Sequence, residues 1–90
     1  MMATTSIHRI YTEDKNKNEI LRLASAQFDS FTVQPIDGYY RGKRERSIVV
    51  EIAGAKPRQI EKLAAQIRRM NRQSAVLILK TRGTAKATRR

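Results

Sequence analysis

The chain of 90 residues has 19 lysines and arginines against 8 acidic residues, which gives a formal net charge of +11. It has no cysteine and one histidine, which excludes disulfides and thiolate metal sites and argues against a histidine-based metal site. A chain of this length forms one domain, and its longest purely aliphatic stretch, residues 75–79, is too short to span a membrane. The first residues, MMATTSIHR, lack the charged-then-apolar order of a signal peptide. We therefore expect a cytoplasmic protein without a metal or cofactor, whose excess charge favours a polyanionic partner.

The first two predicted elements are a strand and a helix. Residues 6–12, SIHRIYT, predict a short strand. Asn16, followed three residues later by Glu19, is typical of a capping box, and Asp14 adds negative charge near the helix start. The apolar spacing after it predicts a helix of about three turns, with these residues on its inner face: Ile20, Leu21, Leu23, Ala24, Gln27 and Phe28.

Residues 31–53, FTVQPIDGYYRGKRERSIVVEIA, predict a long β-hairpin. We place its two-residue loop at Gly42-Lys43, because a glycine in the first loop position suits a type II′ turn. In that register Val33 faces Ile52, and Asp37 is mismatched against Ile48. The mismatch, together with nearby Gly38 and Pro35, predicts a bulge or an edge position.

Side-chain alternation gives this hairpin an apolar root and a basic, aromatic tip on the same face. The root residues are Phe31, Val33, Ile48, Val50 and Ile52, and the tip residues are Tyr39, Arg41, Arg44 and Arg46.

A second helix and a last strand complete the chain. Gly54 ends the hairpin, and Pro57 suits the first turn of a helix. Apolar residues then recur at intervals of three and four, namely Ile60, Leu63, Ala64, Ile67, Met70 and Asn71, while a basic stripe on one flank contains Arg58, Lys62, Arg69 and Arg72. Residues 74–80, SAVLILK, predict a strand with aliphatic side chains on both faces. Residues 1–80 are therefore expected to form the domain, with residues 81–90 as a flexible basic tail.

The order β-α-β-β-α-β is that of the ferredoxin-like fold, an α+β architecture with a four-stranded antiparallel sheet and two helices on one face. Right-handed crossovers place the first and third strands in the middle of the sheet. Ile36 and Val49 are apolar on the uncovered face, and the last strand is apolar on both sides. We therefore predict a homodimer, formed through the open face or by edge pairing.

The sequence offers little for catalysis. His8 is the only histidine, and no serine stands in a recognisable catalytic turn. Motifs of other families with this fold are absent, among them the stacking aromatics of RNA-recognition motifs and the cysteine pair of heavy-metal-associated domains. The segment Tyr11-Thr12-Glu13-Asp14 resembles the small nucleases of CRISPR adaptation, which place an aspartate after the first strand, but helix capping explains Asp14 equally well. We therefore expect no catalytic residue.

We interpret the chain as a non-enzymatic module that binds nucleic acid with low sequence specificity. Cationic side chains would contact phosphates, and the two adjacent tyrosines would stack on unpaired bases. The predicted contacts are Tyr39, Tyr40, Arg41, Lys43, Arg44 and Arg46 on the hairpin, and Arg58, Lys62, Arg69 and Arg72 on the second helix.

Two alternatives stay open. The segments YTED, FDSFTV, GYYRGKRERSIVVEI and NRQSAVLI resemble small phage and plasmid proteins over residues 7–80. That resemblance implies the ferredoxin-like fold and a role in binding and inhibiting a host defence protein. The second alternative is a ligand-sensing oligomer with an extended hairpin, which would bind an anion in a cleft between subunits.

Overall fold

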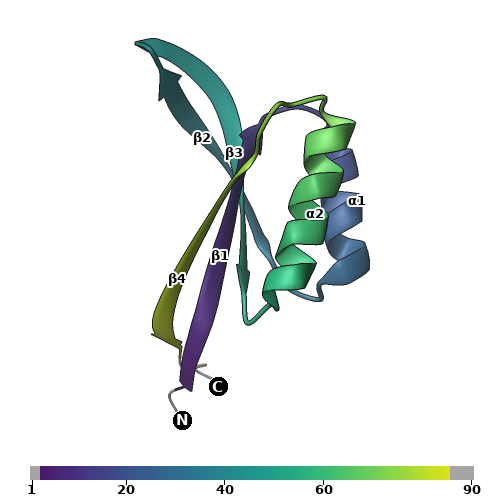
Figure 1. Cartoon of the computed structure of the whole chain (residues 1–90), viewed down its shortest axis with the longest axis vertical. Helices are drawn as coiled ribbons and strands as arrows, with labels where there is room; N and C mark the ends of the chain where they lie inside the picture. Colours follow the sequence, from purple (N-terminus) through teal and green to yellow (C-terminus); the bar gives the residue numbers. More distant parts are fainter. Residues whose placement is uncertain (1–2, 86–90) are drawn as a thin grey trace.

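The computed structural model describes residues 3–85 and has all six predicted elements in the predicted order. They are β1 (Ala3–Glu13), α1 (Lys17–Gln27), β2 (Thr32–Tyr40), β3 (Lys43–Ala53), α2 (Pro57–Met70) and β4 (Leu77–Ala85). The strands form one antiparallel sheet in the order β2-β3-β1-β4, and both helices cover the same face of it (Figure 1). The ferredoxin-like fold is confirmed, with β1 and β3 in the middle.

The core lies between the sheet and the helices. Alternation turns Ile10 of β1 and Ile48, Val50 and Ile52 of β3 toward the helices, where they are fully buried. Of the helix residues predicted to face inward, Leu23, Phe28 and Met70 only pack against the core, and Leu21 is not part of it. The residues that the helices do bury in the core are Ile20 and Ala24 on α1, and Ile60, Leu63, Ala64 and Ile67 on α2. The spacing of apolar residues in the sequence thus indicates which face of β3 and of α2 is buried.

The hairpin turns one residue earlier than predicted. Tyr40 pairs with Lys43, so the loop is Arg41-Gly42. Both loop residues have positive φ, 50° at Arg41 and 78° at Gly42, which fits a type I′ turn and not type II′.

The earlier turn shifts the pairing by two residues, which leaves each side chain on its predicted face. Val33 faces Val50, where Ile52 was expected. The predicted mismatch disappears, since Asp37 faces Arg46 and Pro35 faces Ile48. The pairing runs without a bulge from Thr32 to Tyr40, and Pro35 does lie on an edge strand.

The predicted capping box at Asn16 is wrong, because this residue is left-handed (φ 54°) and its side chain makes no cap hydrogen bond. Its Nδ2 instead donates to Oδ1 of Asn71, at 3.0 Å. Asn71 is buried after α2, so this bond joins the start of one helix to the end of the other. At the start of α2 a side chain does cap the helix, because the Lys56 backbone N–H donates to Gln59 Oε1 at 3.0 Å.

β4 begins and ends later than predicted. It starts at Leu77, and its second half pairs with the first residues of β1, as far as Ala85 with Ala3. Residues 81–85, expected in the flexible tail, are therefore part of the sheet, while residues 86–90 of that tail lie outside the described residues. No helix in the described part of the chain is long and apolar enough to cross a membrane.

Candidate functional site at the hairpin

The β2–β3 hairpin extends beyond the two helices at one end of the molecule (Figure 1). Its apolar root packs on the core, whereas Tyr39 and Tyr40 near the tip are 71% and 60% exposed. A two-stranded ribbon with no covered face is only marginally stable alone. The tip is therefore the part of the sheet most suited to meeting a ligand or another chain.

The two faces of the ribbon separate the residues that the sequence grouped together. Tyr39 lies opposite Arg44 on the helix side, and Tyr40 lies opposite Lys43 on the open side. Arg41 sits in the turn, with its guanidinium 5.2 Å from the centre of the Tyr40 ring, a cation–π contact. The two tyrosines thus point to opposite sides and do not form one stacking platform.

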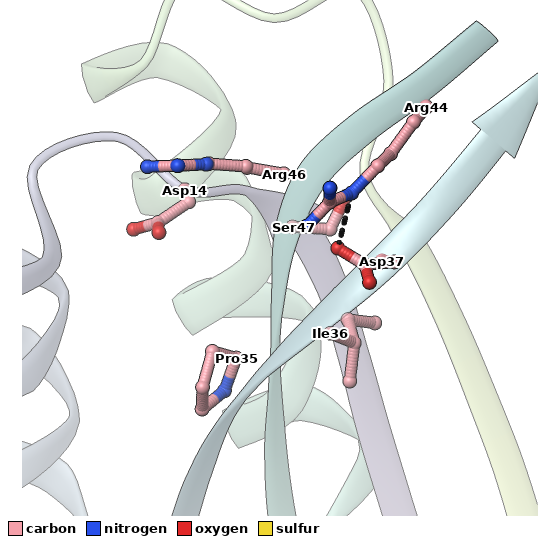
Figure 2. A pocket seen from close by; sticks show the side chains of 7 residues that line it. All are labelled: Asp14, Pro35, Ile36, Asp37, Arg44, Arg46 and Ser47. Carbon is pink, nitrogen blue, oxygen red and sulfur yellow. Dashed lines mark hydrogen bonds and ion pairs between the residues drawn. The ribbon is translucent and has the colours of Figure 1, made fainter.

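A hollow of about 340 Å³ lies where the loop after β1 passes the hairpin. The backbone N–H of Asp14 donates to the carbonyl oxygen of Arg46 at 3.1 Å, which fixes the loop against β3. Figure 2 shows the residues that line the hollow, which are Asp14, Pro35, Ile36, Asp37, Arg44, Arg46 and Ser47.

The two arginines of this hollow differ in their partners. Arg44 Nε donates to Asp37 Oδ1 at 2.9 Å, an exposed ion pair between the two hairpin strands. The Arg46 guanidinium extends toward the Asp14 side of the hollow (Figure 2), and no ion pair within 4.0 Å joins it to another described residue. A guanidinium presents a planar fork of N–H donors that matches an oxyanion. Arg46 can therefore bind a small oxyanion, while the two aspartates limit how much negative charge the hollow accepts.

The basic residues of the second helix do not join this hollow. Arg58, Lys62 and Arg69 lie on the exposed side of α2, and Arg72 follows the helix in a left-handed conformation (φ 54°). None of the four lines the hollow at the hairpin. Of the ten predicted contact residues, two line this hollow, Arg44 and Arg46.

Sequence reasoning missed the two carboxylates of the hollow. Asp37 was predicted to lie opposite Ile48, because the predicted register differs from the observed one by two residues. Asp14 was interpreted as a helix-capping charge or as the aspartate of a nuclease site. Among residues 3–85, no group of three or more histidine, aspartate or glutamate side chains is arranged to hold a metal ion. The sequence could have shown this pairing. Placing the loop at Arg41-Gly42, one residue earlier than predicted, puts Asp37 opposite Arg46.

No family model matches the chain, and no curated protein matches it. Solved structures do match in fold over nearly the whole length. CPII of Thiomonas intermedia, a nitrogen regulatory PII-like protein bound to ADP, AMP and bicarbonate, aligns with a TM-score of 0.68 at 10% identity, over 98% of this chain and 99% of its own. CutA of Synechococcus elongatus, complexed with Bis-Tris, aligns with a TM-score of 0.67 at 14% identity, over 96% of this chain and 90% of its own. A putative PII-like signalling protein of Thermus thermophilus aligns with a TM-score of 0.57 at 16% identity, over 93% and 90% of the two chains.

These comparisons overturn the nucleic-acid-binding hypothesis and favour the ligand-sensing alternative. The similar structures include regulatory and signalling proteins, and the bound molecules named with them are small ligands. The geometry agrees, since Tyr39 and Tyr40 lie on opposite faces and Arg44 is paired with Asp37. The resemblance to phage and plasmid proteins, with its host-inhibitor alternative, stays a prediction.

Proposed function

We propose that the protein is a self-associating sensor that binds a small oxyanion in the hollow at the hairpin. The observation that supports it most directly is Arg46, whose guanidinium reaches the hollow without an ion-pair partner among the described residues. The exposed Arg44–Asp37 ion pair joins the two hairpin strands on the other side of the hollow (Figure 2).

The ligand is a monoanion of the carboxylate or bicarbonate type. Two arginines and two aspartates line the hollow, so its formal charge balances, and a second negative charge on the ligand would be repelled by the aspartates. The fold comparison supports small anions of this size, because CPII of Thiomonas intermedia was solved with bicarbonate and, in another structure, with acetate beside adenine nucleotides.

Self-association involves the open face of the sheet. Leu77 and Leu79 of β4 are 62% and 42% exposed there, and Leu77 is in register with Tyr11 of β1, which in turn faces Val49 of β3. A row of apolar side chains across three strands, without a helix over it, is typical of a protein–protein contact. Covering this face with a second copy would bury Leu77 and Leu79, whereas Val49 is already buried at 7% exposure.

Calorimetric titration of the full-length protein tests the ligand proposal. We expect bicarbonate or acetate to bind at constant ionic strength, and Arg46→Gln to weaken that binding about tenfold, because it removes a charge-assisted hydrogen bond. Arg58→Gln removes the same charge from the exposed side of α2 and serves as the matched control, with affinity unchanged. Absence of binding by both bicarbonate and acetate, or equal weakening by both variants, would show that the hollow is not the site.

A further inference from the structure

A second candidate site lies around the only histidine of the chain. His8 points to the helix side of β1 and is 3% exposed. Its Nδ1 is buried and has no hydrogen-bond partner, the one such side-chain atom in the part of the chain that the structure describes. Buried polar atoms nearly always have a partner, so an unpaired one beside a cavity leaves a hydrogen-bonding position that an occupant of the cavity can use.

A cavity of about 240 Å³ adjoins this imidazole, between β1, β4 and the start of α2. It is separate from the hollow at the hairpin and shares no residue with it. It is smaller than pockets for drug-sized ligands, which limits its occupant to a small molecule. The lining consists of His8, Pro57, Ile60, Glu61, Ile78 and Lys80.

The lining combines an apolar surface with two opposite charges on different elements. Ile60 and Ile78 supply the apolar surface, from α2 and β4. Lys80 is the register partner of His8 on β4, and Glu61 is on α2. No ion pair within 4.0 Å joins Lys80 or Glu61 to each other or to another described residue. The cavity therefore presents a cation, a carboxylate and an apolar surface at the same time.

We propose that this cavity binds a free α-amino acid with an aliphatic side chain. Lys80 binds the carboxylate of the ligand, Glu61 binds its ammonium group, and the side chain packs on Ile60 and Ile78. His8, a neutral imidazole with one donor and one acceptor, forms a hydrogen bond with the polar end of the ligand. Only a zwitterion satisfies both charges, which distinguishes this ligand from a simple carboxylate or amine.

The single histidine is a unique spectroscopic reporter for this site. Long-range ¹H–¹⁵N spectra of the full-length protein, prepared without a histidine tag, show one imidazole, that of His8. We expect leucine to shift these signals saturably at pH 7.5. Isocaproate, which lacks the ammonium group, and isoamylamine, which lacks the carboxylate, should each bind at least about tenfold more weakly, because each leaves one charge of the cavity unpaired.

Variants decide whether the two charges act as proposed. Lys80→Gln and Glu61→Gln should each raise the dissociation constant of leucine about tenfold. Arg82→Gln, on the same face of β4, and Glu45→Gln, on the hairpin, remove equal charges outside the cavity and should leave it unchanged. No leucine-dependent shift of His8, binding of isocaproate as tight as that of leucine, or equal effects of cavity and control variants would each overturn the proposal.

Discussion

At the scale of single residues, His8 makes the folding stability depend on pH. Burial, and then the charge of Lys80, lowers the pKa of His8 from its ordinary value. As the pH falls through the unfolded value of about 6.5, the unfolded imidazole takes up a proton that the folded one does not, so stability decreases. The charged groups that line the cavity beside it are Lys80 on β4 and Glu61 on α2, and its other register partner is the apolar Ile52.

We therefore expect the free energy of unfolding to fall between pH 7.5 and 5.5, measured by urea denaturation. His8→Gln should flatten this slope whatever it does to the absolute stability, because glutamine does not titrate. Equal slopes for the wild type and the variant would show that His8 is as free to take up a proton in the folded protein as in the unfolded chain.

The candidate site was only partly predictable at this scale. The basic and aromatic residues of the hairpin stand out in the sequence, but their partners depend on the register, and the register depends on the turn. The turn places Arg41 in the left-handed region, which costs non-glycine residues roughly 1–2 kcal/mol. The conformational preferences of the residues therefore favoured a loop that begins with Gly42. Because that loop gives the wrong register, the sequence did not predict the Asp37–Arg44 ion pair.

At the scale of elements, this turn offers a direct test of the observed register. Asn-Gly is a preferred loop for type I′ turns, so Arg41→Asn should increase the free energy of unfolding by up to about 1 kcal/mol. The variant also loses the cation–π contact with Tyr40, which reduces this gain. Lys43→Asn is the matched control, because residue 43 begins β3, where asparagine is unfavourable, and it should give no gain. Urea denaturation measures both, and a gain from the control alone would support the loop at Gly42-Lys43.

The fold was predictable from the sequence, because apolar residues recur at the spacing of a strand or of a helix in each element, and the order of those elements defines the fold. Ile48, Val50 and Ile52 alternate on β3, and α2 has a three-four repeat. The end of β4 was not predictable in this way. Residues 81–85, TRGTA, lack an apolar pattern and join the sheet by pairing with the start of β1, a non-local partnership that periodicity does not encode.

At the scale of the whole molecule, the open face and the net charge act in opposite directions on self-association. The exposed leucines of β4, Leu77 and Leu79, favour a contact between copies, while the charge of +11 on each chain opposes it. Salt screens the repulsion between chains and leaves the burial of apolar surface intact. The mass in solution should therefore increase with added sodium chloride, which light scattering after size-exclusion chromatography measures directly.

Substitutions at two neighbouring residues of β4 can show which surface forms the contact between copies, because their side chains point to opposite faces of the sheet. Leu77 is in register with Tyr11 on the open face, whereas Ile78 is in register with Ile10 on the helix side. Leu77→Gln should lower the mass of the complex toward that of one chain, and Ile78→Gln should leave it unchanged. Equal loss in both variants would instead indicate pairing along the free edge of β4, and a single-chain mass for the wild type at every salt concentration would exclude self-association through either surface.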